Sequence, residues 1–562
     1  MRFVHTLIVP INGRPRLHPP HLSSYVGNVF FTASSISLSR NLQSEPFVDT
    51  VKQVHRALQR MDDEYLRSAL DYLEAMPDIT VGRSEAGTFR CTNAIFLGTN
   101  PRFIDLYFSA ISTAVMEELK LTVKGWSMIC PAQHTPKETH WVSNLDMVMT
   151  TFHVPILFFY KPNGSSDFFK PHVLEEALSK VLVPFYPMAG RLGCDENGRF
   201  EIICNAEGVL WVEAETTSAI NDLGGFTPSP KLRKLVPTVD YSGGTGSYPL
   251  FIAQLTTFKC GGVCLGIGVH HTLMDGTATF HFVNSWSEMA RGLSQIRVAP
   301  LIDRTLLRAR VPPTPRFHHV EYDPSPSLIT PVSNLKPSTT ISVFKITQNQ
   351  LNNLKTKLFK HENKSKGKYS NYTILTAHIW RCASKARGLL DDQPTKLLMP
   401  INGRPKLHPP LPSSYFGNVF FSASSISLSV NLQSEPFEDT VERVHGALQR
   451  MNDEYLRSAL DYLETLSDIT AARREAETFQ CPNLNINNWM RLPMHDADFG
   501  WGCPIYTGLA NIIHEGKIYL VRTPSDDGSL SLIACLEISH MEHFEKHLYD
   551  GILSIDKIKA RY

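Results

Sequence analysis

The segment from His270 to Gly276, which reads HHTLMDG, contains residues that could catalyse a proton transfer. His271 and Asp275 lie four positions apart within it. A neutral imidazole can take a proton from a hydroxyl or an amine near neutral pH, and general-base catalysis of this kind typically contributes ~10²–10⁴ in rate. The spacing alone is weak evidence, because a histidine followed four positions later by an aspartate arises by chance about once in a chain of this length.

The sequence around this motif indicates how it is presented. An apolar run at 263–269 leads directly into it and predicts a strand that ends near His270. His270 then points to the opposite side from His271, and we expect it to be structural. Asp275 could hold the following loop or fix the imidazole tautomer, and Gly276 gives the backbone freedom for a turn.

A second motif, DFGWG at 498–502, is much rarer than the first. Asp-Phe-Gly also occurs in protein kinases as a metal-binding triplet, but the Gly-rich nucleotide loop and the catalytic-loop signature that accompany it there are absent from this sequence. The glycines on both sides of Trp501 predict a tight turn. We therefore expect Asp498 and Gly500 to have a structural role.

Strand-like and helix-like segments alternate along most of the chain. Alternating or continuous apolar residues predict strands at 154–160, 251–258, 263–269 and 341–346. Apolar residues at helical spacing predict helices at 173–182, 279–293 and 372–389. This interleaving indicates the α/β class. The Pro- and Ser-rich sequence at 312–337 predicts a connection between two halves.

Composition excludes several classes of protein. The chain has 562 residues, 55 Lys plus Arg against 54 Asp plus Glu, and a net charge of +1, so no basic excess points to nucleic acid or to an anionic membrane. Its 10 cysteines are too sparse for a disulfide scaffold, and the pair Cys260 and Cys264 lacks a second Cys/His pair at zinc spacing. No apolar run is long enough for a membrane helix. We expect a cytoplasmic monomer without a bound metal.

A long internal repeat divides the chain. Residues 10–93 repeat residues 400–483 without a gap at an offset of 390, and about three-quarters of the aligned positions are identical. Units of solenoid proteins are about 20–50 residues long, so this repeat indicates a truncated duplication. Residues 94–115 match nothing else in the chain, and Met116 follows them as a plausible start. Our hypothesis is that two neighbouring genes, the first a fragment, were joined here.

Several motifs together resemble the BAHD family of plant acyl-CoA-dependent acyltransferases. Besides HHTLMDG and DFGWG, they are LVPFYPMAGRL at 182–192, AHIWRC at 377–382 and YFGNV at 415–419. AEGVL at 206–210 and WSEMARGL at 286–293 are typical of its shikimate/quinate hydroxycinnamoyltransferase branch. The resemblance covers 116–562.

The resemblance implies two chloramphenicol acetyltransferase-like domains with mixed sheets and a channel at their interface. The domains would be 116–310, with HHTLMDG, and 341–562, with DFGWG, joined by a crossover loop at 311–340. Residues 1–93 would be a truncated duplicate of 391–483, and 94–115 a linker of unknown origin. The fragment has no histidine motif and has Ser84 where the full domain has Arg474, so it is not expected to be a second enzyme.

The resemblance also implies a mechanism. His271 would deprotonate the hydroxyl of a small acceptor acid, such as quinate or shikimate, and the oxygen would attack a hydroxycinnamoyl-CoA thioester. Acyl-CoA is a substrate here, and neither an acyl-enzyme nor a cofactor is needed. Trp501 would lie near the intermediate, while Asp275, Gly276, Asp498 and Gly500 would support the site.

Five positions bear on the choice of acceptor. Arg474 occupies the place where shikimate-using relatives grip the acceptor carboxylate, and a guanidinium suits a carboxylate bidentately. Val154, Ile156 and Phe158 stand where those relatives have hydroxyl-bearing residues, and Asn487 replaces an acceptor threonine. Because a site built to bond hydroxyls discriminates through them, these changes leave quinate or another hydroxy acid open as the acceptor.

Two alternatives remain. One is an amide-forming protein, either an N-acyl member of the family or a condensation domain, since the superfamily of condensation domains shares the two-histidine motif. The sequence contains no carrier-protein region of the kind that accompanies condensation domains. The other is a non-catalytic or misfolded relative that only binds a ligand. Intact His271, Asp275 and Arg474 argue against the second alternative.

Overall fold

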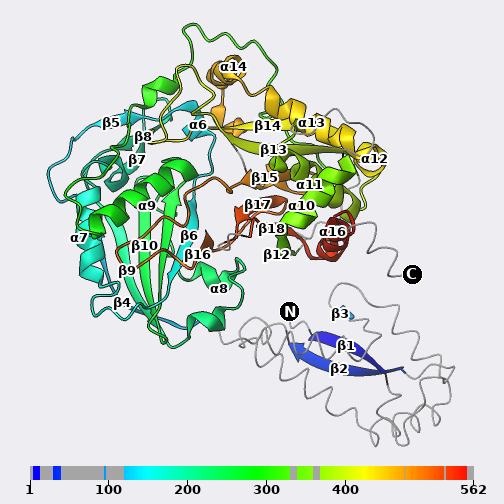
Figure 1. Cartoon of the computed structure of the whole chain (residues 1–562), viewed down its shortest axis with the longest axis horizontal. Coiled ribbons are helices and arrows are strands. Elements are labelled where there is room, and N and C mark those ends of the chain that lie inside the picture. Colours follow the sequence, from blue (N-terminus) through cyan, green and yellow to red (C-terminus); the bar gives the residue numbers. More distant parts are fainter. Residues whose placement is uncertain are drawn as a thin grey trace, which may run out of the picture. The chain divides into compact units, whose positions relative to one another are not determined.

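The computed structural model describes residues 4–12, 30–38, 94–95, 119–329, 338–358, 368–473, 475–523 and 527–552. By its internal contacts the chain divides into two units, Met1–Glu118 and Leu119–Tyr562. The second unit begins three residues after the predicted start at Met116 (Figure 1). Each unit is described by itself below.

The first half of the large unit is built on a six-stranded mixed sheet. In spatial order its strands are β16 (Tyr506–Leu509), β6 (His153–Tyr160), β11 (Val263–His270), β10 (Phe251–Phe258), β9 (Val209–Thr216) and β4 (Leu121–Ile129). A small sheet lies beside it, in the order β5 (Thr139–Trp141), β8 (Phe200–Ile203) and β7 (Arg191–Cys194). The helices of this half are α6 (Asn144–Met147), α7 (Pro171–Val181), α8 (Pro230–Arg233) and α9 (Gly276–Ala290).

The central strands of this sheet are buried on both faces. Alternate residues of β6 enter different cores: Ile156 and Phe158 join the cluster that contains Phe280 of α9, whereas Leu157 and Phe159 join a second cluster on the other face. The sequence predicted half-buried strands here. The second face of the sheet is covered by apolar residues in α8 and in the segments before and after it. A strand that is buried on both faces has a nearly continuous run of apolar residues in its sequence.

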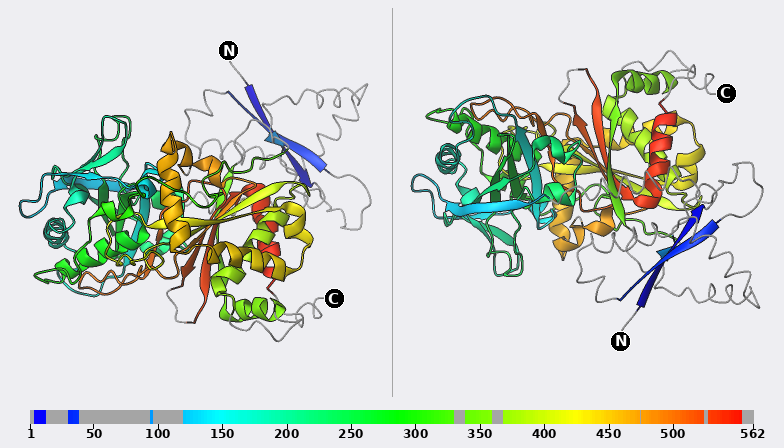
Figure 2. Two further views of the ribbon diagram at one scale, coloured as in Figure 1. Left: turned by 90° about the horizontal axis from the view of Figure 1, so that it is seen from above. Right: turned by 90° about the horizontal axis from the view of Figure 1, so that it is seen from below.

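The second half is also a six-stranded mixed sheet with helices against it (Figure 2). Its strands, in spatial order, are β12 (Thr339–Ile346), β18 (Leu530–Glu537), β17 (Lys517–Arg522), β15 (Leu484–Asn488), β13 (Pro394–Asn402) and β14 (Phe420–Leu428). Its helices are α10 (Gln348–Leu358), α11 (Asn371–Ala386), α12 (Ser429–Ser434), α13 (Phe437–Gln449), α14 (Asp453–Thr465), α15 (Ala476–Phe479) and α16 (Ile538–Asp550). The predicted α/β class with two mixed sheets is confirmed.

Strand β16 crosses the predicted boundary between the two halves. β16 lies within the predicted C-terminal domain 341–562, but it pairs antiparallel with β6 and so completes the first sheet. Figure 1 shows it beside β6, although the two strands are far apart in the sequence. Within the predicted crossover loop 311–340, the described residues 311–329 contain no helix or strand, and β12 begins at Thr339.

The small N-terminal unit contains a three-stranded sheet in the order β2 (Phe30–Leu38), β1 (Val4–Asn12) and β3 (Ala94–Ile95). β1 pairs with β2 from Val4↔Leu38 to Asn12↔Phe30, and β13 pairs with β14 from Pro394↔Leu428 to Asn402↔Phe420. β3 pairs parallel with β1 through the same two positions that join β15 to β13. The backbone pairing of the duplicate therefore extends two residues past Asn93, where the sequence similarity ends.

Candidate active site

A cavity of about 220 Å³ lies between the two halves of the large unit. β6 and the start of α9 line it from the first half, and β13, β15 and β17 line it from the second. His271 is part of this lining, together with Asp275 and Gly276 of the same motif. The fold therefore brings the predicted base to a site that neither half could form alone.

The backbone of His271 is fixed from both halves. Its N–H donates to the carbonyl of Phe152, 3.2 Å away, and its carbonyl accepts a hydrogen bond of 2.9 Å from the side-chain amide of Asn418. The imidazole is half-buried and lies 5.7 Å from the ring of Phe420, centroid to centroid. This arrangement holds the imidazole at the wall of the cavity.

His270 lies on the other side of the strand and does not line the cavity. It is fully buried, 5.3 Å from the ring of His153, and its Nε2 lies 3.4 Å from the hydroxyl of Tyr248. Burial lowers the pKa of His270 well below its ordinary value. A permanently neutral, enclosed imidazole suits the structural role predicted for it.

Asp275 is engaged by backbone and guanidinium groups. It is the N-cap of α9, accepting from the N–H of Ala278 at 3.1 Å. Arg404 holds both of its carboxylate oxygens, at 2.7 and 3.1 Å, and the N–H of Val419 adds a third contact at 2.9 Å. Both charged side chains are almost fully buried. These contacts place Asp275 as a link between the two halves.

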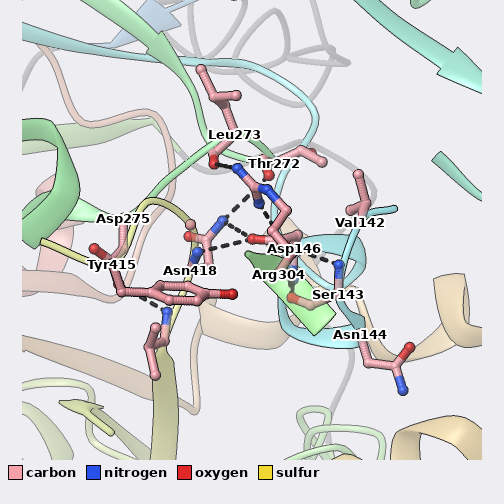
Figure 3. Close-up of polar contacts among 12 residues, drawn as sticks. Val142, Ser143, Asn144, Asp146, Thr272, Leu273, Asp275, Arg304, Tyr415 and Asn418 are labelled. Atoms are coloured by element: carbon pink, nitrogen blue, oxygen red, sulfur yellow. Dashed lines mark hydrogen bonds and ion pairs between the residues drawn. The ribbon is translucent and has the colours of Figure 1, made fainter. Parts of the chain in front are cut away.

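A second buried ion pair lies beside the first. Arg304 contacts Asp146 at 2.7 Å and also donates to the carbonyl of Leu273 at 2.6 Å. Asn418 donates to Asp146 through both its backbone N–H and its side chain, at 2.9 and 2.8 Å. Figure 3 shows Arg304 and Asn418 converging on Asp146. Removing one partner of such a pair leaves an uncompensated buried charge, so this network is expected to fix the 271–275 segment strongly.

Gly276 is the first residue of α9 and lines the cavity. A Cβ added there would lie 3.3 Å from Cδ1 of Leu492. The sequence suggested that this glycine serves a turn. In the structure its φ is not in the left-handed region, and the side chain of Leu492 leaves little room for a larger residue here.

The DFGWG segment does not line the cavity. The carboxylate of Asp498 accepts the N–H groups of Gly500 and Gly502, at 2.8 and 2.9 Å, and both glycines have positive φ. Trp501 packs 4.8 Å from the ring of Phe169, and its Nε1 donates to Asp167. The structure thus places Asp498 and Gly500 in a tight turn, and Trp501 is not among the described residues that line the cavity.

The residues predicted to bind the acceptor fall into three groups. Val154, Ile156 and Asn487 line the cavity. Phe158 does not line the cavity, because it is fully buried and packs edge-to-face with Phe280, 6.2 Å away. It lies on the same face of β6 as Ile156, but helix α9 covers that face at Phe158. Arg474 lies outside the described residues.

Sequence reasoning missed several residues of the lining. They include Phe420, Asn485, Trp489, Lys517 and Tyr519, which belong to strands β14, β15 and β17 or follow them directly. The alternating polar pattern of LNINN at 484–488 was a signal for a strand with one polar face. The sequence does not show which cavity this polar face borders, because that depends on the pairing of β15 with β13 and β17, which lie elsewhere in the sequence.

Two general features complete the description. The described part of the chain contains no cluster of three or more His, Cys, Asp or Glu side chains that could hold a metal ion. Within the same residues, every helix is too short or too polar to cross a lipid bilayer. The site as a whole consists of an imidazole and a cavity that strands of both sheets line, with polar groups on one wall. These features suit the transfer of a proton from a bound nucleophile to the imidazole.

Comparison with known proteins defines the class. A family model described as "Transferase family" matches residues 2–104 and 119–550. Vinorine synthase has the same fold over 77% of this chain and 98% of its own, with a TM-score of 0.59 and 22% identity. Fusarium graminearum TRI101, solved with coenzyme A and deoxynivalenol, matches with a TM-score of 0.58 and 18% identity over 73% of this chain and 97% of its own. The chain belongs to the BAHD acyltransferase family.

Curated relatives are much closer in sequence. A shikimate O-hydroxycinnamoyltransferase of Nicotiana tabacum is 51% identical over 437 residues, which cover 77% of this chain and all of the relative. A hydroxycinnamoyl-CoA:5-hydroxyanthranilate N-hydroxycinnamoyltransferase of Avena sativa is 46% identical over 77% of this chain and all of its own length. The protein is therefore an acyltransferase.

Proposed function

We propose that this enzyme transfers a hydroxycinnamoyl group, such as p-coumaroyl or caffeoyl, from CoA to a hydroxyl of a small acceptor acid such as quinate or shikimate. The observation that carries the proposal is that His271 lines a cavity shared by the two halves. The 51% identical O-hydroxycinnamoyltransferase supports the choice of acyl group and acceptor.

The proposed reaction is a single acyl transfer. The imidazole of His271 takes the proton of the acceptor hydroxyl as its oxygen attacks the thioester carbonyl carbon. The tetrahedral intermediate then collapses, the carbon–sulfur bond breaks, and the CoA thiolate receives the proton from the imidazolium. Atoms and charges balance without a covalent acyl-enzyme, a metal or another cofactor, so CoA thioester and acceptor are the two substrates.

The fixed backbone around His271 gives this role its physical basis. A general base must lie within hydrogen-bond reach of the proton that it takes. The contacts from Phe152 and Asn418 set the position of the His271 backbone, and the Asp275–Arg404 and Asp146–Arg304 pairs fix the segment that follows. Holding the base in place before the substrates bind reduces the entropic cost of reaching the reactive geometry.

The test is a transfer assay with the full chain. Purified protein is incubated with p-coumaroyl-CoA and either quinate or shikimate, and released CoA thiol and ester product are both measured. We expect ester formation that depends on both substrates. A folded protein that releases no CoA with either acceptor, and with no other hydroxy acid in a panel, would refute the proposal.

One specific observation favours a second candidate, amide formation. N-hydroxycinnamoyltransferases of Avena sativa are 46% and 45% identical to this chain over their whole length. The same base can serve an amine nucleophile. Adding 5-hydroxyanthranilate to the acceptor panel distinguishes the two, because a higher kcat/KM for the amine than for the acids would favour N-acyl transfer. The monomeric state and the cytoplasmic location stay predictions.

A further inference from the structure

The cavity has two chemically different walls. β6 and β16 supply an apolar wall through Val154, Ile156 and Leu509, and Ile156 pairs directly with Leu509 across the two strands. β15 and β17 supply a polar wall on the opposite sheet. An aromatic acyl chain is stabilised by the first kind of surface and a hydroxylated acid by the second.

Cross-strand pairing fixes the composition of the polar wall. β15 and β17 run parallel, with Asn485 paired to Lys517 and Asn487 paired to Tyr519. Residues two apart on a strand point to the same face, so these four side chains form one patch, and all four line the cavity. The amide of Asn487 donates to Oδ1 of Asn485 at 2.7 Å, which orients the pair.

Lys517 gives this patch its charge. Among the described residues of the lining, the side chains of a type that can carry a charge near neutral pH are His271, Asp275, His514 and Lys517. Asp275 is neutralised by Arg404, and burial lowers the pKa of His514 to about 4, so that this imidazole is neutral near pH 7. Lys517 therefore brings an ammonium group to the polar wall of the cavity.

The ammonium group of Lys517 is held in position. It lies 4.4 Å from the ring centroid of Phe479, which also lines the cavity. A cation over an aromatic face is stabilised by the ring quadrupole. The side chain is half-buried, so an anion beside it would be screened by solvent less than at an exposed lysine.

We propose that Lys517 is a specificity-determining residue that binds the carboxylate of the acceptor and selects acidic acceptors over their neutral analogues. This inference rests on the proposed function. A hydroxycinnamoyl chain has no charge to match an ammonium, whereas an acceptor acid carries a carboxylate at neutral pH. Lys517 thus discriminates between acceptors without touching the reacting atoms.

The test compares two acceptors and three proteins. Quinate and its methyl ester are used as acceptors with p-coumaroyl-CoA, in the full chain and in the variants Lys517→Met and Arg522→Met. Arg522 is the matched control, since it lies on the same strand, carries the same charge and is exposed outside the cavity. A hydrogen bond to a charged group is strong enough to change affinity by about 10- to 100-fold.

We expect Lys517→Met to raise the KM for quinate by about 10-fold or more, from the loss of that charge-assisted contact. The KM for the methyl ester and for p-coumaroyl-CoA should change little, and Lys517→Arg should retain most of the preference for the acid. Arg522→Met should behave as the unchanged protein. An unchanged acid-to-ester preference in Lys517→Met, or an equal loss in Arg522→Met, would overturn the proposal and leave the carboxylate to another residue such as Arg474.

A binding measurement separates this proposal from the proposed function. Calorimetric titration of quinate into the unchanged protein and into Lys517→Met needs no turnover. If transfer fails but quinate binds the unchanged protein more tightly than the variant, the reaction was assigned wrongly and the role of Lys517 stands. If quinate binds both proteins equally, or binds neither, the role of Lys517 is rejected.

Discussion

The two copies of the repeated segment form the same strand ladder in different settings. β1, β2 and β3 pair in the order and register of β13, β14 and β15, at a constant offset of 390. In the second copy, β15 also pairs with β17 and so extends the sheet, and the loop after β13 supplies Arg404 and Asn418 to the HHTLMDG segment. The first copy carries Arg14 and Asn28 at the corresponding positions.

This difference separates what a segment encodes from what its neighbours add. A strand pair and its register follow from local pattern and turn. A catalytic site additionally requires charged partners, and the chain contains a single His271–Asp275 motif for Arg404 to hold. A duplicated segment therefore reproduces the ladder without reproducing the site.

The largest expected effect comes from His271→Ala. If all transfer depends on the second copy and its partner motif, this change should lower kcat by ~10²–10⁴, the usual contribution of a general base. The assay is CoA release from p-coumaroyl-CoA with a saturating acceptor. Circular dichroism controls for folding, and near-normal rates in a folded variant would reject His271 as the base.

A matched pair of arginine variants compares the two copies directly. Arg404→Ala leaves the buried carboxylate of Asp275 without its partner, and breaking a buried pair typically costs about 3–5 kcal/mol. Arg14→Ala, at the duplicate position, should change the free energy of unfolding of the large unit by less than about 0.5 kcal/mol. Urea denaturation measures both. Equal losses in the two variants would contradict the assignment of this ion pair to the second copy.

A pH dependence of stability should arise outside both copies. Burial lowers the pKa of His153 to about 4, against the opposing hydrogen bond to the carbonyl of Pro249. Because the unfolded chain binds a proton near pH 6.5 and the folded chain only near pH 4, the free energy of unfolding should fall as the pH drops through this window, by about 3 kcal/mol in total.

The control for this dependence is His153→Gln, which removes the titrating group. Its free energy of unfolding is expected to be lower at neutral pH, since the hydrogen bonds to Tyr241 and Pro249 are altered, but to vary less between pH 6.5 and pH 4. An unchanged slope in this variant would show that other groups control the acid sensitivity.

The smallest expected effect is that of deleting residues 1–118. The described residues that line the cavity lie between Met149 and Tyr519, and a unit with its own core can fold alone. We expect kcat and KM to stay within about twofold of the values for the full chain. A larger loss would show that the first copy contributes to the active enzyme.

Much of the fold followed from the sequence because its signals are local. β10 spans 251–258 as predicted, and α7, α9 and α11 lie within a few residues of their predicted ranges. The position of His271 depends on two local features, the end of strand β11 at His270 and the N-cap of α9 at Asp275. Both features are encoded by residues close to His271 in the sequence. Phe158 shows the limit: alternation gave its face correctly, but the covering helix α9 lies more than 100 residues further along the chain.

The sequence by itself determined the family, the two sheets, the repeat and the position of His271 at the end of a strand. Only the tertiary structure decided that Asp275 meets Arg404, that β16 completes the first sheet, that Trp501 packs against Phe169, and that Lys517 shares a wall with Asn487. Local patterns are set by the periodicity of one segment. Contacts between distant segments depend on which surfaces are buried together, and no single segment carries that information.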